Sequence, residues 1–116
     1  MVKLAKGFRA AWNGLKETLI KERNFKIMLA AALAVIFLMF YLPTNKTEKV
    51  ALLITTFSVL TLELLNSTVE RLMNFLHPEP DERIRAIKDL SAAIVMFASI
   101  GAVIIGLVIF WSYFFH

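Results

Sequence analysis

Four polar residues recur at helical spacing in an otherwise apolar part of the chain: Glu63, Asn66, Glu70 and Asn74. Residues at these offsets share one face of a helix. A carboxylate inside a membrane span is costly and is by default a candidate for function. Glu63 is such a carboxylate, and it could accept a proton from a lipid hydroxyl. The alternative is a structural role, in which Glu63 is protonated or hydrogen-bonded between helices.

Three further charged residues are expected at the same membrane depth. Glu22 ends a basic amphipathic segment, and Lys88 and Asp89 begin the last apolar one. Carboxylate and amide oxygens suit a hard cation such as Mg²⁺, and a lysine suits a phosphate. Phosphoryl transfer needs little beyond positioning and charge stabilisation. The residues expected to converge on one site at the inner interface are Glu22, Glu63, Asn66, Glu70, Lys88 and Asp89. The alternative is a network of salt bridges that packs the helices.

The elements that must position these residues are predicted to be membrane helices. The chain has 116 residues, of which 59% are hydrophobic, more than a soluble chain of this length could bury. Apolar segments at 27–42, 50–72 and 90–115 predict three transmembrane helices in one domain over 1–116. The second helix is expected to continue to about Leu76, where His77-Pro78-Glu79-Pro80 breaks it. Asp81 is the expected N-cap of the third helix.

Residues 1–24 predict a different kind of helix. Their apolar residues recur at intervals of three and four, and lysines and arginines occupy the other face. This pattern is typical of an amphipathic helix that lies in the membrane interface. The alternative is a soluble amphipathic helix. The residues of the apolar stripe are Leu4, Phe8, Trp12, Leu15 and Leu19.

The distribution of basic residues predicts the orientation. Lysines and arginines concentrate before the first span and in the loop 77–88 and its flanks, whereas the turn between the first two spans has two, Lys46 and Lys49. The positive-inside rule places the N-terminus and the loop in the cytoplasm. The site would then face the cytoplasm from a bacterial inner membrane. Clustered basic residues suit an anionic membrane surface or a phosphate better than nucleic acid.

Small residues predict self-association. Ala98, Ala102 and Gly106 form a row with a spacing of four on the third span, and Ala30 and Ala34 do so on the first. Such rows let helices approach closely. We therefore expect a homo-oligomer. The chain has no cysteine, which excludes disulfides and thiolate metal sites.

Three ordered blocks resemble a known family. They are Glu63-Leu64-Leu65-Asn66-Ser67-Thr68-Val69-Glu70, Lys88-Asp89-Leu90-Ser91-Ala92-Ala93, and Glu22 followed by Phe25 and Lys26. The chain is similar over nearly its whole length to the small prokaryotic diacylglycerol kinases, a family that includes undecaprenol kinases. The resemblance implies an ATP- and Mg²⁺-dependent lipid kinase that forms a homotrimer with sites shared between subunits.

The resemblance also implies roles for individual residues. Glu63 resembles the catalytic base, and Glu22 and Glu70 resemble metal ligands, with Asn66 nearby. Lys88 and Asp89 resemble contacts to the nucleotide phosphates and the active site. Glu79 and Asp81 fall where the family's loop approaches ATP.

Two departures from the family pattern bear on activity. Asn74 stands where the family usually has Asp, so we expect the nucleotide affinity or the local charge balance to differ from the family's. Ala92 and the string Glu22-Arg23-Asn24-Phe25-Lys26-Ile27 resemble the undecaprenol kinase branch, although Met28 replaces its usual His. The acceptor stays open between undecaprenol, which we favour, and diacylglycerol. Two other functions stay open: a non-catalytic structural or regulatory oligomer, supported by Asn74, and a small transporter that uses Glu63.

Overall fold

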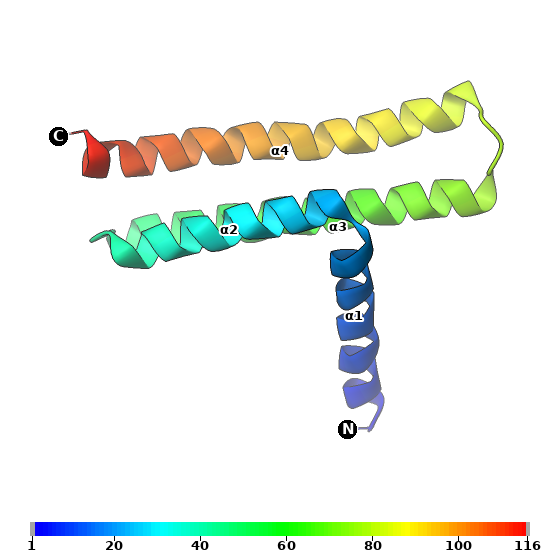
Figure 1. The fold of residues 1–116 in the computed structure, drawn as a ribbon, viewed down its shortest axis with the longest axis horizontal. Helices are drawn as coiled ribbons and strands as arrows, with labels where there is room; N and C mark the ends of the chain where they lie inside the picture. Colours follow the sequence, from blue (N-terminus) through cyan, green and yellow to red (C-terminus); the bar gives the residue numbers. More distant parts are fainter. Residues whose placement is uncertain (1, 116) are drawn as a thin grey trace.

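The computed structural model describes residues 2–115 and is helical throughout (Figure 1). It contains α1 (Val2–Lys21), α2 (Arg23–Tyr41), α3 (Lys46–Leu76) and α4 (Glu82–Phe114). The last three are long and apolar enough to cross a membrane. The prediction of an all-α chain with three apolar helices of spanning length is therefore confirmed. The position of α1 on a membrane surface and the homotrimer stay predictions.

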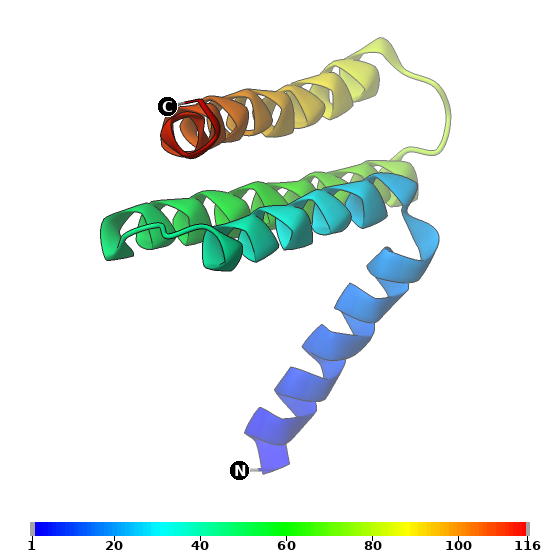
Figure 2. The ribbon, with the colours of Figure 1, turned by 60° about the vertical axis from the view of Figure 1, so that its left-hand side comes forward.

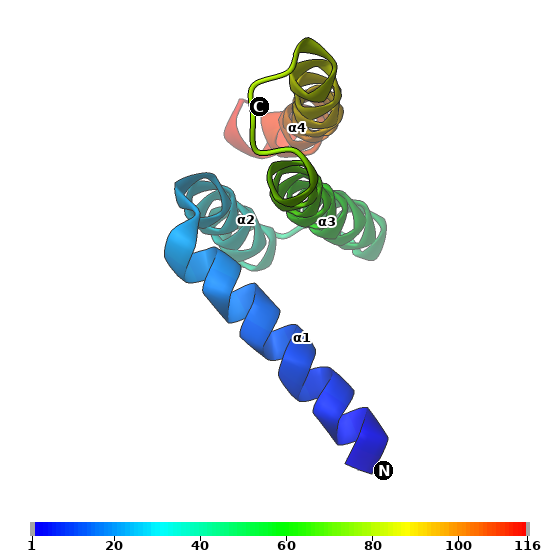
Figure 3. The same ribbon diagram turned by 90° about the vertical axis from the view of Figure 1, so that its right-hand side faces the viewer.

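Helix α3 lies at the centre of the arrangement. It packs against both α2 and α4, and the three helices run side by side (Figure 3). α1 runs at a steep angle to these three helices, and its N-terminal end lies away from them (Figure 2). The helix predicted to carry Glu63, Asn66, Glu70 and Asn74 on one face therefore contacts both of the other apolar helices.

The corner between α1 and α2 is a single residue, Glu22. Its backbone is extended, with φ of −109° and ψ of 115°, so the two helices cannot merge. Its N–H still donates to the Thr18 carbonyl at 2.9 Å, and its carbonyl accepts from Lys26 at 3.3 Å. α2 begins at Arg23, so residues 23–24 belong to it and not to the surface helix predicted over 1–24. It ends at Tyr41 because Pro43 follows closely.

Helix α3 begins at a capping box. The Asn45 side chain accepts from the Glu48 N–H at 2.8 Å, and the Glu48 carboxylate accepts from the Asn45 N–H at 3.0 Å. The same carboxylate accepts from the Tyr113 hydroxyl at 2.5 Å, which ties the end of α4 to this turn. α3 continues without a break to Leu76, as predicted.

Helix α4 begins where the sequence predicted its N-cap. The Asp81 carboxylate accepts from the Arg83 N–H at 2.8 Å, and this bond holds the pKa of Asp81 below its usual value. The segment 77–88 therefore consists of a short link and the first turns of α4. The two prolines in that link, Pro78 and Pro80, prevent α3 from continuing into α4.

Most apolar side chains of the described residues are not covered by the chain itself. Phe97 is 73% exposed and Val108 is 72% exposed, whereas the buried apolar residues are few. Exposed apolar surface of this extent requires lipid or another chain to cover it. The buried apolar residues are Phe25, Ala32, Met39, Leu52 and Val95.

Candidate active site

The centre of the candidate site is a polar pair buried among apolar helices. Glu63 is 5% exposed and Asn66 is 9% exposed, one helical turn apart on α3. Both line a hollow of about 340 Å³ that α2 and α4 complete. We call it the Glu63 hollow, and its lining residues are Asn24, Ile27, Met28, Glu63, Asn66, Ala92, Val95 and Met96.

An unsatisfied acceptor lies beside the carboxylate. The Asn66 Oδ1 atom is buried and has no hydrogen-bond partner among the described residues. Leaving a buried acceptor unpaired costs roughly 1–3 kcal/mol, so native proteins rarely do so without a reason. A hydroxyl donor or a hard cation in the Glu63 hollow would satisfy it.

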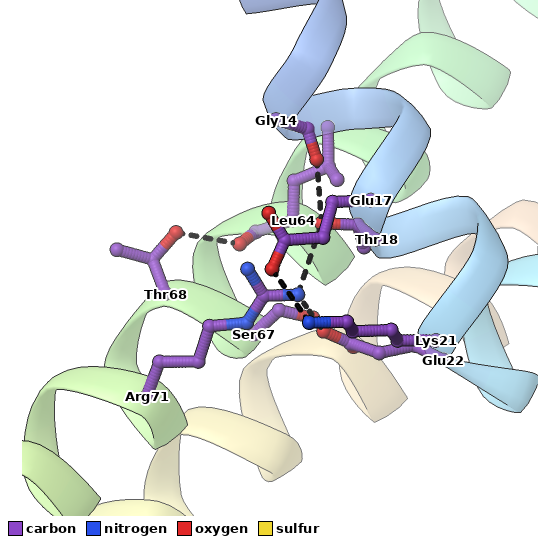
Figure 4. Close-up of polar contacts among 9 residues, drawn as sticks. All are labelled: Gly14, Glu17, Thr18, Lys21, Glu22, Leu64, Ser67, Thr68 and Arg71. Carbon is purple, nitrogen blue, oxygen red and sulfur yellow. Dashed lines mark hydrogen bonds and ion pairs between the residues drawn. The ribbon is translucent and has the colours of Figure 1, made fainter.

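Glu22 is held against α3 by two partners (Figure 4). The Ser67 hydroxyl donates to its Oε1 atom, and the Arg71 guanidinium donates to its Oε2 atom at 2.7 Å. Arg71 also donates to the Thr18 hydroxyl at 3.1 Å. The corner residue between α1 and α2 is therefore tied to the helix that carries Glu63.

The sequence analysis missed Thr18, Ser67 and Arg71. A signal was present, because Thr18 and Glu22 are four residues apart, as are Ser67 and Arg71. Residues at this spacing are neighbours on a helix surface. Nothing local to either segment, however, predicts that these two faces meet.

Glu70 is exposed on α3, two helical turns after Glu63 and on the same face of the helix. Within residues 2–115, the acidic and histidine side chains form no group of three or more that would hold a metal by itself. Mg²⁺ does not need one, because it usually takes one or two carboxylates, several waters and substrate phosphates. The carboxylates of Glu22 and Glu70 and the unpaired Asn66 oxygen are of the ligand types that such a site uses.

Lys88 lies in a second hollow, formed by the link between α3 and α4. Its ammonium donates to the Asn74 amide oxygen, and both line this hollow of about 500 Å³ with Glu79 and Asp81. We call it the loop hollow. It brings together the residues that the resemblance assigns to ATP, with the exception of Asp89.

Asp89 pairs with another residue of its own helix. Its carboxylate accepts from Arg85 at 2.7 Å, and its side chain is 63% exposed. The predicted convergence of six residues is therefore divided in this chain. Glu63 and Asn66 line one hollow, and Glu22 contacts Ser67 and Arg71 beside it. Lys88 joins Asn74 in the loop hollow, and Asp89 pairs with Arg85.

Comparison with known proteins gives consistent matches over most of the chain. Residues 9–110 match the family model described as prokaryotic diacylglycerol kinase. The chain is 30% identical over 109 residues to a diacylglycerol kinase of Escherichia coli strain K12, covering 94% of this chain and 84% of that protein. It is 32% identical over 105 residues to an undecaprenol kinase of Bacillus subtilis strain 168, covering 90% and 85%.

A third relative is a diacylglycerol kinase of Synechocystis sp. strain ATCC 27184 / PCC 6803 / Kazusa, which is 33% identical over 100 residues. The match covers 85% of this chain and 57% of that protein. The region that matches the family model, residues 9–110, includes most of each helix and every residue that lines the two hollows.

Proposed function

The chain belongs to the prokaryotic diacylglycerol kinase family, and from this premise we propose that it transfers the γ-phosphate of ATP to the hydroxyl of a membrane lipid alcohol, with Mg²⁺. Family membership supports a lipid kinase with several membrane helices. The nucleotide, the metal and the acceptor are the further steps of the proposal.

The observation that carries the proposal is the buried pair in the Glu63 hollow. Glu63 is 5% exposed beside an Asn66 oxygen that lacks a partner among the described residues. Helices with apolar outer surfaces surround the hollow, so a lipid alcohol can approach from the bilayer. In the proposal the Asn66 amide N–H donates to the hydroxyl oxygen of the acceptor and orients it, and Glu63 takes the single hydroxyl proton. The hydroxyl oxygen then attacks the γ-phosphorus, and ADP leaves.

The remaining residues would stabilise the charge of the transferred phosphoryl group and position the nucleotide. Mg²⁺ bound through Glu22 and Glu70 would neutralise part of the charge on the transferred phosphoryl group. Lys88 supplies a positive charge in the loop hollow, where Glu79 and Asp81 line the opening for the nucleotide. Positioning and electrostatic stabilisation of this kind account for most catalysis of phosphoryl transfer.

The proposal includes a place in the cell and an assembly. We place the chain in the bacterial cytoplasmic membrane with both hollows towards the cytoplasm and α1 on the inner surface. The proposed assembly is a homotrimer with sites shared between subunits. Its support is the uncovered apolar surface and the row that contains Gly106, where a Cβ added to the glycine would meet nothing within 4 Å.

We favour undecaprenol over diacylglycerol as the acceptor. The wall of the Glu63 hollow is apolar at Met28, Ala92 and Met96, and its polar groups are Asn24, Glu63 and Asn66. Such a lining suits an alcohol with a single hydroxyl on a hydrocarbon chain. Relatives named for either acceptor match at similar identity, so identity does not decide between them.

Phosphate transfer tests the proposal. Purified protein would be given radiolabelled ATP and Mg²⁺ with undecaprenol or diacylglycerol in parallel mixed micelles, and Glu63→Gln would serve as the inactive control. We expect label in the lipid, and more in undecaprenol. Label in neither lipid, from folded protein, would favour a non-catalytic oligomer instead. The observation behind that second function is Asn74, an uncharged partner for Lys88.

A further inference from the structure

Arg71 contacts the residue that the proposed function assigns to the metal. Its guanidinium donates to the Glu22 Oε2 atom at 2.7 Å and to the Thr18 hydroxyl at 3.1 Å (Figure 4). The Glu22 side chain is 25% exposed, and that of Arg71 is 47% exposed. This pair is partly screened from water, unlike the exposed pair of Lys21 and Glu17 beside it.

The contact leaves Glu22 with both carboxylate oxygens engaged. Ser67 donates to Oε1, and Arg71 donates to Oε2. A cation that approached this carboxylate would meet the positive guanidinium at one of the two oxygens. Two positive charges on the same carboxylate repel each other, so the cation and Arg71 compete for Glu22.

Losing Arg71 would not release Glu22 from α3. The Ser67 hydroxyl belongs to the same helix and holds the other oxygen. The carboxylate would therefore keep an anchor while one of its oxygens became free. This separates competition from simple support, because a residue that only supported Glu22 would weaken cation binding when removed.

We propose that Arg71 is a positioning residue that competes with a divalent cation for the Glu22 carboxylate. The inference rests on the proposed function in one respect, namely that Glu22 is a metal ligand. The inference adds that Arg71, which is not itself a ligand, affects how tightly the cation binds. The same contact holds the corner between α1 and α2 on α3.

The test is direct binding of Mn²⁺ to the full chain in detergent micelles, with free Mn²⁺ followed by electron paramagnetic resonance. Arg71→Gln removes the charge and keeps a hydrogen-bond donor, so we expect it to bind Mn²⁺ about fivefold more tightly, the effect of one half-exposed charge pair. Arg71→Lys keeps the charge and should stay close to the wild type. Arg71→Met is a second neutral variant and should show the same tightening.

Two further variants serve as controls. Arg9→Gln removes the same charge from the far part of α1 and should leave Mn²⁺ binding unchanged, which excludes an effect of net charge. Glu22→Gln should weaken binding in the wild-type background. If it does not, Glu22 is no ligand, and the proposed metal site fails together with this inference. If Glu22→Gln weakens binding while the neutral Arg71 variants bind equally or less tightly, only the inference is overturned and Arg71 is a packing contact.

Discussion

At the scale of the residue, the burial of the Glu63 carboxylate is the feature that most needs a chemical explanation. A carboxylate that is 5% exposed among apolar helices has lost most of its hydration, and burying a charge without compensation is expensive. A protein retains such a group when it has a proton to accept or a cation to bind.

Glu63→Gln should abolish phosphate transfer. The amide has nearly the same size and cannot accept the hydroxyl proton, so we expect turnover to fall by at least about 100-fold, the usual range for loss of a general base. The oligomer should persist, as measured by size-exclusion chromatography in detergent. An active Glu63→Gln variant would contradict the assigned role.

Glu70→Ala should change the metal dependence of the reaction. Glu70 is exposed on α3, so its removal should leave folding intact while a proposed Mg²⁺ ligand is lost. We expect the Mg²⁺ concentration for half-maximal rate to rise by about tenfold or more, in line with the loss of one ligand or its immediate support. Glu17→Ala, which removes an exposed carboxylate paired with Lys21, is the control, and an unchanged Mg²⁺ titration for Glu70→Ala would exclude Glu70 as a ligand.

At the scale of the element, α3 is the helix that carries most residues of the candidate site. A single helix from Lys46 to Leu76 carries the buried pair, the exposed Glu70 and the two residues that hold Glu22. It can do so because its ends are defined locally. The capping box at Asn45 starts it, and the prolines after His77 prevent it from continuing.

Asn45→Ala should destabilise the chain by about 1 kcal/mol, the usual cost of losing an N-cap side chain. The loss would expose the first N–H groups of α3 and remove one half of the capping box. Reversible unfolding in mixed micelles measures the change in the free energy of unfolding. Thr47→Ala lies in the same turn and is the matched control, since Thr47 is exposed. Equal stabilities of the two variants would exclude a contribution from the cap.

The whole molecule leaves a large apolar surface to its surroundings. Phe97 and Val108 on α4 are mostly exposed, and Gly106 on the same helix has open space where a side chain would begin. Lipid can cover the large residues. A row of small residues instead allows the close approach of another helix.

Gly106→Leu should therefore weaken the proposed homotrimer. A leucine side chain at this position would hold two helix backbones apart, and we expect a shift from trimer to monomer in cross-linking and sedimentation experiments in detergent. Val108→Leu changes a position on another face of α4 and should leave assembly unchanged. An intact trimer with Gly106→Leu would place the subunit interface elsewhere.

The orientation in the membrane is open to test because the chain has no cysteine of its own. Single cysteines replacing Thr47 and Arg83 would be treated with a membrane-impermeant maleimide. We expect labelling of the Thr47 variant in intact spheroplasts, and of the Arg83 variant only after the membrane is opened. The reverse pattern would place the two hollows on the outer face and contradict the use of cytoplasmic ATP.

The sequence by itself determined the helices, the end of α3 near Leu76, the N-cap of α4 at Asp81 and the face of α3 that carries Glu63 and Asn66. These properties are local, since they depend on a cap, a proline or a spacing of three and four residues along one segment. The sequence did not place the boundary between α1 and α2, which lies at Glu22 and not after residue 24. Only the tertiary structure decided which of the polar residues meet. It buried Glu63 and Asn66 and left Glu70 exposed, joined Lys88 to Asn74, and joined Glu22 to Arg71 across 49 positions of sequence. Such pairings depend on how separate helices turn towards one another, and no pattern within a single segment contains that information.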